Sequence, residues 1–495
     1  MQPSTSYPHN TYNITHHINH ITSKLKVFLH KHNMPSLKSP KLIPDGLNEV
    51  ERAVYQKIID TVAALRKNNY VFPHVVAITD LGKDYDDLAA MIVLKELHRL
   101  GAIKLEGFVA NLLPADKRAH LGRRALDLLG LRDISVGQGT NGTDKEAKPQ
   151  IYEFPPSVMG KKPYPIQPKG SESLMQIKYK AEREGYKLTF CLISSLQDIS
   201  EFEERLRPKD PSQPHPLKQI TAKVVLQGAY NLENCPEHDS KGLPHRRILK
   251  ADRIAANNDF NWQAAQDFHS FLDREEIPSV VYTKTAAYDA HLRPSIFHDM
   301  AQTGQTLGIA LKGIEGPQNT GFYEGACRME GGKPAPFMKG RDQQWFLLRR
   351  THYFDTRPRE LNPEKLPKGE EILKYCKVIV YDALAALGTL PEAILDALDV
   401  LEAPNYEKQL VHNKLHRVVG VMPEKNWELA TQDELDKARL VNDEDNPFKS
   451  PASTTENMKT VLEALLMGAM LDCKAKGVGH EPGDKSGLGG VKKAK

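Results

Sequence analysis

Short runs of apolar residues alternate with helical patterns along most of this chain. The predicted strands are residues 75–78, 105–109, 134–136, 188–193, 224–226 and 280–282. Between or before them, apolar residues recur at helical spacing, for example over residues 47–65, 88–97 and 117–129. Strands without polar alternation, separated by helices, are typical of a parallel sheet that is covered on both faces. We therefore expect an α/β fold with a mostly parallel, open, twisted sheet, a Rossmann-like core with helices on both faces.

Shifts in composition predict one large domain with polar ends. Residues 1–45 are rich in Ser, Pro, Asn and His, and we expect a disordered extension there. Residues 46–70 form the predicted N-terminal helix, and residues 71–472 form the predicted catalytic domain. Within that domain, residues 315–369 are rich in polar residues, Pro and Gly, which predicts an insertion. Residues 473–495 are rich in Gly and Lys and predict a flexible tail.

Composition and charge narrow the class of protein. Hydrophobic residues make up 40% of the 495 residues and charged residues 26%, which is enough for a large buried core. The formal net charge of +4 is too small at this length to indicate nucleic-acid or membrane partners. The five cysteines form no CxxC pair, which argues against a disulfide framework and a zinc site. Because residues 1–20 contain no apolar core of a secretory signal, we expect a cytoplasmic protein, with the nucleus left open.

Chemistry is expected just after the first predicted strand, because ligands bind beyond the carboxyl ends of parallel strands. Asp80 ends that strand, Asp84 lies in the following loop, and Asp86 and Asp87 open the next helix. An acid at a helix N-terminus can simply cap the helix, which is the structural alternative for Asp86. Capping does not account for several neighbouring carboxylates, which repel one another unless a cation lies between them. Oxygen ligands of this kind suit Ca²⁺ or Mg²⁺.

This loop resembles that of the nucleoside hydrolases of the inosine–uridine preferring type, whose signature is a strand, Asp-x-Gly and a tandem Asp-Asp that opens a helix. Here Lys83 to Tyr85 lengthens the loop by two residues, which leaves the role of Asp84 open. Further segments match in the same order, so that the resemblance covers roughly residues 73–400. These segments are Phe108-Val-Ala-Asn111, Ile193-Ser-Ser-Leu-Gln-Asp198, Ala256 to Ala265 and Lys377 to Ala386.

The resemblance implies a site and a reaction. The metal would be Ca²⁺ rather than Mg²⁺, and the substrate a small nucleoside-like molecule. The implied activity is hydrolysis of its N-glycosidic bond to base and ribose, as in purine or pyrimidine salvage. Asp80 would be the general base, and a homo-oligomer is left open. The implied metal ligands are Asp80, Asp87, the carbonyl of Ile193 and Asp382, and the implied substrate-binding residues are Asp86, Asn111, Asn257, Asn258 one register away, Tyr381 and Asp382.

Three departures from the family pattern support an alternative, a non-catalytic protein that binds a nucleoside or sugar, and the lengthened acidic loop is the first of them. Ala255 stands where many members have the Glu that contacts the 5'-hydroxyl, which argues against an ordinary unmodified ribonucleoside. Tyr381 replaces a His that protonates the leaving base, and Tyr is a poorer acid with a reference pKa of about 10. It can instead stack on the base. A metal-dependent phosphohydrolase is less favoured, because Lys83 is the one basic residue near Asp80 in sequence.

Overall fold

The computed structural model describes residues 42–143, 149–160, 167–234, 247–330, 333–334, 338, 340–355, 366–400, 415–419 and 452–479. Its centre is a seven-stranded sheet in the order β11-β8-β5-β4-β1-β2-β3, in which every neighbouring pair is parallel. This topology confirms the predicted α/β class. The strands are β1 (His74–Thr79), β2 (Lys104–Ala110), β3 (Ser135–Gln138), β4 (Leu188–Leu192), β5 (Thr221–Gln227), β8 (Ser279–Tyr282) and β11 (His416–Val419).

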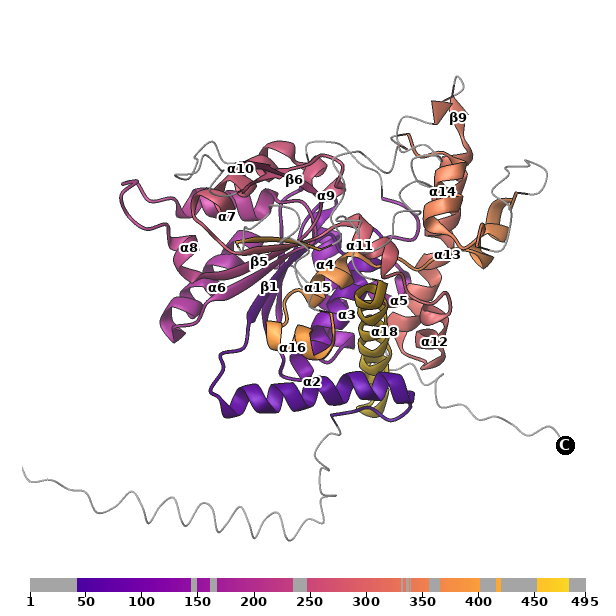
Figure 1. Cartoon of the computed structure of the whole chain (residues 1–495), viewed down its shortest axis with the longest axis horizontal. Helices are drawn as coiled ribbons and strands as arrows, with labels where there is room; N and C mark the ends of the chain where they lie inside the picture. The colour runs from indigo at the N-terminus through magenta and orange to yellow at the C-terminus, as the bar shows by residue number, and fades with distance from the viewer. Residues whose placement is uncertain are drawn as a thin grey trace, which may run out of the picture. The chain divides into compact units, whose positions relative to one another are not determined.

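Helices cover both faces of the sheet (Figure 1). In β1, Val75 and Ala77 point into one apolar cluster, and Val76 and Ile78 point into the other, as expected for alternating side chains. The first cluster includes residues of α2 (Glu49–Lys67), α3 (Asp86–Arg99), α4 (Ala115–Leu128), α12 (Ile296–Gln302), α13 (Thr306–Cys327), α15 (Tyr381–Leu387), α16 (Glu392–Ala397) and α18 (Ala452–Ala475). The second includes residues of α6 (Gly170–Glu184), α7 (Gln197–Leu206), α8 (Pro216–Ile220) and α10 (Trp262–Arg274).

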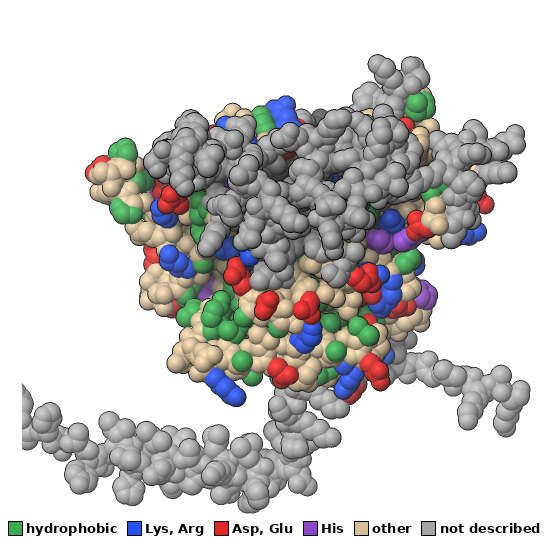
Figure 2. All heavy atoms as spheres, viewed as in Figure 1, with side chains coloured by type: hydrophobic (Ala, Val, Ile, Leu, Met, Phe, Trp, Pro, Cys, Tyr) green, Lys and Arg blue, Asp and Glu red, His purple; other side chains and the backbone are tan. Residues whose placement is uncertain are grey.

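The remaining described elements are short or lie at the rim. They are the antiparallel pairs β6 (Tyr230–Asn234) with β7 (Arg247–Ala251) and β9 (Met329–Glu330) with β10 (Lys333–Pro334), and α5 (Pro156–Met159), α9 (Ala256–Phe260), α11 (Lys284–Asp289), α14 (Gln343–Arg350) and the 3₁₀ helix η2 (Gly369–Lys374). In the described part of the chain, no helix combines the length and the apolar character that a membrane crossing requires. Figure 2 shows acidic and basic side chains interspersed over the described part of one face.

The two ends of the predicted domain differ in how much the structure says of them. Residues 1–41 of the predicted extension and residues 480–495 of the predicted tail lie outside the described residues. Helix α18 continues to Ala475 and buries Cys473, so the start of the predicted tail belongs to the packed fold. This helix packs against α2 and α3, which the sequence analysis did not foresee.

The predicted polar insertion, residues 315–369, contains more regular structure than its composition suggests. Helix α13 runs through its start, and α14 lies within it. Aromatic residues of both helices, among them Tyr323, Trp345 and Phe346, form a third apolar cluster of their own. Because this cluster holds α13 and α14 together, the segment can present side chains to the rest of the domain in fixed positions.

Candidate functional site

Four carboxylates from two distant parts of the chain meet at the carboxyl end of β1. One oxygen from each of Asp84, Asp86, Asp87 and Asp382 lies within 4.8 Å of the other three. Asp86, Asp87 and Asp382 are buried. Asp382 reaches the group because α15 packs directly against α3. The convergence of loop 80–87 with residue 382, which the sequence hypothesis required, is therefore present.

Helix capping does not explain these acids. Asp86 is the first residue of α3, whose N-cap is Tyr85, and the capping residue makes no side-chain hydrogen bond. Asp382 likewise lies in the first turn of α15, whose N-cap residue, Val380, makes no side-chain hydrogen bond to the helix. The carboxylate of Asp87 instead accepts hydrogen bonds from the Thr79 hydroxyl and from the backbone N–H of Asp80, 3.1 Å away. The acidic side chains are therefore held toward one another rather than toward the helix ends.

The loop between β1 and α3 depends on a glycine at position 82. Gly82 has φ +88°, a conformation that other residues rarely adopt. A Cβ at this position would lie 2.5 Å from the carbonyl oxygen of Glu153 and from a methyl group of Leu121. The Asp-x-Gly motif therefore reflects a backbone that turns tightly and packs closely after the strand.

Arg118 of α4 binds the backbone of this loop, and the sequence analysis did not identify it. Its guanidinium is 2% exposed and donates to the carbonyls of Asp80 and Leu81, both at 3.1 Å. It also bonds the carbonyls of residues 112 and 113 and forms a 2.7 Å ion pair with Glu153. Arg118 thus fixes the backbone from which the carboxylate of Asp80 extends, and it supplies positive charge beneath the acidic group.

We expect replacement of Arg118 by Met to lower the free energy of unfolding by about 3–5 kcal/mol, because the substitution leaves Glu153 and several carbonyls buried without their partner. Urea unfolding measures this loss. The affinity for Ca²⁺, followed by calorimetry, should fall as well. Arg123→Met is the matched control, because Arg123 also lies on α4 and donates to backbone carbonyls, but to those of Leu131 and Ile134. An equal loss of Ca²⁺ affinity in both variants would contradict a specific role for Arg118.

The lengthened part of the loop contributes Tyr85, which connects it to the segment before Asp382. Tyr85 is buried, and its hydroxyl accepts a 3.3 Å hydrogen bond from the backbone N–H of Ile379. Its backbone N–H donates to the side chain of Gln318, at 3.2 Å. One residue therefore links the acidic loop, the approach to α15 and helix α13, which explains how a longer loop still brings its carboxylates to Asp382.

The electrostatics of the group are those of crowded, buried acids. Burial raises the pKa values of Asp86, Asp87 and Asp382 well above their ordinary range, and the neighbouring carboxylates raise them further. Burial also raises the pKa of Asp80, although the positive charges of Lys83 and Arg118 oppose this effect. Among the described residues, Oδ1 of Asp86 is buried without a hydrogen-bond partner. Lys83 and Arg118 lower the pKa of Asp80, and Arg118 that of Asp87, but neither effect offsets burial.

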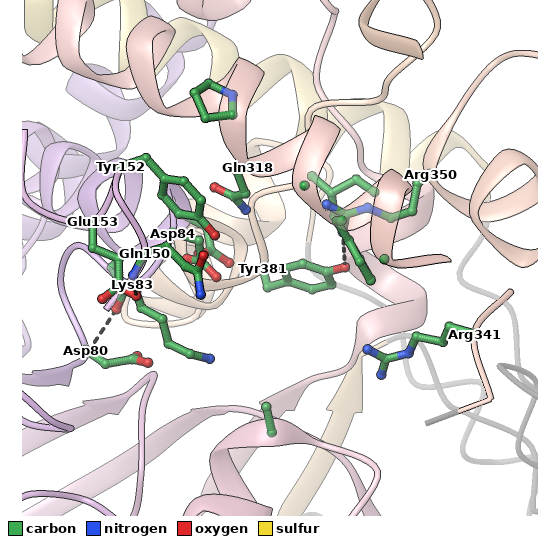
Figure 3. Close-up of a pocket in the computed structure, with 18 of the residues that line it drawn as sticks. Asp80, Lys83, Asp84, Gln150, Tyr152, Glu153, Gln318, Arg341, Arg350 and Tyr381 are labelled. Carbon is green, nitrogen blue, oxygen red and sulfur yellow. Dashed lines mark hydrogen bonds between the residues drawn. The ribbon is translucent and has the colours of Figure 1, made fainter. Parts of the chain in front are cut away.

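The acidic group opens into a cavity of about 850 Å³. Its lining includes residues from the acidic loop, from α9 and α15, and from the predicted insertion. Figure 3 shows Asp80 and Asp84 on one side, Tyr381 near the middle, and Arg341 and Arg350 on the other side. The apolar and aromatic surface comes mainly from Ile151, Tyr152, Tyr288, Phe322, Trp345, Ile379 and Tyr381.

The structure brings most of the predicted site residues to this cavity. Its lining includes Asp80, Asp86, Asp87, Asn257, Tyr381 and Asp382. Asp84, whose role the sequence left open, belongs to the group of four carboxylates, whereas Asp80 lies beside that group and is not a member of it. Of the two residues considered on α9, Asn257 lines the cavity, and its amide donates to the side chain and carbonyl of Gln227.

Three predicted residues do not line the cavity. The side chain of Asn111 donates to the Ser195 carbonyl and to Asp198, and accepts from Ser194, so it is used within the protein. The amide of Asn258 similarly donates to the carbonyls of residues 229 and 252. Ile193 is buried just after β4, and its N–H donates to Ile78. The roles assigned to these three residues stay predictions.

Comparison with solved structures identifies proteins of similar fold. The effector protein XOO4466 superposes with a TM-score of 0.58 at 19% identity, covering 86% of this chain and 99% of that one. The type III effector XopQ, solved with adenosine diphosphate ribose, gives 0.57 at 18% identity, covering 86% of this chain and 100% of that one. The chain has the fold of these two effectors.

Nucleoside hydrolase structures are also among the matches, as the resemblance in sequence predicts. The purine-preferring ribonucleoside hydrolase from Gardnerella vaginalis gives a TM-score of 0.40 at 14% identity, covering 80% of this chain and 99% of that one. No protein-family model matches the chain, and no curated protein sequence matches it.

Proposed function

We propose that this protein hydrolyses the N-glycosidic bond of a small ribosyl compound with the help of a divalent cation, most plainly Ca²⁺. The observation that carries the proposal is the convergence of Asp84, Asp86, Asp87 and Asp382 at the end of a large cavity. The likeness in fold to XopQ, whose structure contains adenosine diphosphate ribose, supports a ligand that includes ribose. Cleavage of such a bond develops positive charge on the sugar, which a carboxylate-lined site stabilises.

The residues present fit a hard cation. All four side chains offer oxygen, and Ca²⁺ accepts six to eight oxygen ligands in flexible geometry, whereas Mg²⁺ demands a stricter octahedron. Asp86 contributes an oxygen that has no partner among the described residues. Asp87 and Asp382 are common to this group and to the ligands inferred from the sequence, while Asp80 and the Ile193 carbonyl stay predicted ligands beside it. A bound cation of this kind lowers the pKa of a coordinated water toward neutrality.

The side chains around the group then have distinct tasks. Asp80 accepts the proton of the attacking water, and burial raises the pKa of this carboxyl above its ordinary value, which makes it a stronger base than a free aspartate. Asp86, Asn257 and Asp382 hold the sugar hydroxyls and thereby fix the reacting carbon relative to the water. Tyr381 offers its ring to the leaving base. Its pKa is raised well above the ordinary value, mainly by burial, so the phenol stays neutral.

The second candidate is a protein that binds the same kind of ligand without cleaving it. Ala255 and Tyr381, in place of the Glu and His of many nucleoside hydrolases, are the specific observations that favour it. The location in the cytoplasm and the assembly into oligomers stay predictions under either candidate.

A panel assay separates the two candidates. The full-length protein is incubated with ribonucleosides, their 5'-phosphates and adenosine diphosphate ribose, with Ca²⁺ or with a chelator, and the released base or ribosyl product is measured by chromatography. Hydrolysis of at least one compound that stops with the chelator supports the proposal. Tight binding by calorimetry without any turnover would instead support the binding protein.

A further inference from the structure

The charged residues that line the cavity fall into an acidic part and a basic part. Five basic residues contribute to the lining, namely Lys83, Lys284, Arg328, Arg341 and Arg350. Arg341 and Arg350 lie across Tyr381 from Asp80 and Asp84 (Figure 3). The sugar hydroxyls of a neutral nucleoside could bind to the carboxylates at the acidic end of the cavity. Such a ligand has no anionic group that could bind to Arg341 and Arg350 at the opposite end.

Arg350 is the most informative of these residues, because it is buried and forms an ion pair with no carboxylate in the part of the chain that the structure describes. Its side chain belongs to the last residue of α14 and is 4% exposed. Nη1 donates to the Tyr381 hydroxyl at 2.6 Å, and Nε is buried with no acceptor among the described residues. The guanidinium lies over the ring of Phe322, with its carbon 5.3 Å from the ring centre. A buried guanidinium that is offset only by a phenol and a π face is costly unless an anion joins it.

Arg341 extends this arginine end of the cavity. Its guanidinium stacks on Trp345, with its carbon 5.3 Å from the ring centre, and points into the cavity (Figure 3). Stacking of this kind fixes the plane of the guanidinium group. Glu324 of α13 also lines the cavity, but it is exposed, so water screens its charge. Two planar guanidinium groups on one wall match the oxygens of a phosphate or diphosphate.

We propose that the cavity takes a phosphorylated ribosyl ligand, a nucleotide or a nucleoside diphosphate derivative, whose phosphate oxygens accept hydrogen bonds from Arg350 and Arg341. This inference rests on the proposed function for the position of the ribose at the acidic end, and it adds the chemical class of the group at the opposite end.

The test compares two ligands that differ in one phosphate. The affinities of the full-length protein for AMP and adenosine are measured by calorimetry at a fixed Ca²⁺ concentration. We expect AMP to bind at least about tenfold more tightly, the gain typical of a charge-assisted hydrogen bond. In Arg341→Met and Arg350→Met this preference should fall toward unity. Arg274→Met is the matched control, because Arg274 lies on α10, is largely exposed and does not line the cavity.

Each other result overturns the inference. Equal affinity for AMP and adenosine in the wild-type protein, or no binding of either, excludes a phosphate site. A preference that survives both substitutions excludes these arginines. If Arg350→Met fails to fold by circular dichroism, Arg341→Met decides alone, since Arg341 is only partly buried. Because the ratio is a binding measurement, a preference for AMP without any cleavage would sink the proposed hydrolysis and leave the phosphate site standing.

Discussion

Replacing Asp80 by asparagine is expected to lower the turnover number for N-glycosidic hydrolysis by about 100- to 10,000-fold, the range over which a general base contributes. Asparagine keeps the size of the side chain but cannot accept the proton of the attacking water. The measurement is the initial rate of base release at saturating ligand, using the best substrate from the panel. The affinity for that ligand should change much less than the rate.

The same variant separates the two roles predicted for Asp80, general base and metal ligand. This carboxylate lies outside the group of four whose oxygens approach one another within 4.8 Å. We therefore expect Asp80→Asn to keep Ca²⁺ affinity within about tenfold of the wild type, since the four remaining acids supply the charge. Asp273→Asn is the control, because Asp273 is a buried acid on α10 that does not line the cavity. Undiminished hydrolysis by Asp80→Asn would rule out the proposed base.

Asp87→Asn and Asp382→Asn are expected to weaken the binding of the cation. Each substitution removes one charge from the group of four carboxylates, and we expect the affinity for Ca²⁺ to fall by about 100-fold or more. Calorimetric titration of the chelator-treated protein measures this change. Hydrolysis should fall in parallel and recover in part at high Ca²⁺, which distinguishes these variants from Asp80→Asn.

The same two variants are expected to be more stable than the wild type when no metal is present. Burial and mutual repulsion raise the folded-state pKa of Asp382 above its ordinary value of 3.8. The metal-free protein therefore loses stability as the pH rises from about 3.8 toward the raised pKa of this carboxyl. An uncharged side chain avoids this loss, and the melting temperature at pH 7 should rise by a few degrees, while near pH 3 the difference should vanish. A lower melting temperature in metal-free Asp382→Asn would show that this carboxylate has a stabilising partner in the protein.

Much of the sheet could be predicted because its strands are buried on both faces. Continuous apolar runs such as Val75 to Ile78 identify such strands without knowledge of their neighbours. The acidic loop was equally visible, since several carboxylates after one strand are difficult to explain by local structure. The link to Asp382 was implied by the resemblance of Lys377 to Ala386 to a nucleoside hydrolase segment, and no described strand of the sheet directly precedes Asp382.

The edge strand β11 and helix α18 were not predicted, for different reasons. Strand β11 has four residues, begins with His416 and Arg417, and pairs only with β8 among the described strands, so its apolar signal is short. Helix α18 lies after a long polar stretch, and its packing against α2 and α3 is set by tertiary contacts. The apolar signal of β11 is therefore weak, whereas that of α18 is strong, because Val461, Leu462, Leu465 and Leu466 are apolar and buried, and it could have predicted this helix.

Site residues that lie close together in sequence, such as those of the acidic loop, could be predicted. Residues that join the site through partners distant in sequence could not. Nothing near Arg118 in sequence indicates that it holds the carbonyl of Asp80, and nothing near Arg350 indicates that it faces Tyr381. The arginines of the cavity are distant in sequence from the acidic loop, so the basic residues near Asp80 in sequence did not include them. Asn111 shows the converse case, because its position after β2 suggested a ligand contact while Ser195 and Asp198 occupy its amide.

The most direct test of the account is to locate Ca²⁺ by anomalous scattering in crystals grown with the ion. The account predicts one strong peak among the carboxylates of Asp84, Asp86, Asp87 and Asp382, at about 2.3–2.6 Å from oxygens of Asp87 and Asp382. A map with no peak at this position would contradict the account. The ammonium group of Lys83 lying among the four carboxylates in place of the ion would contradict it as well.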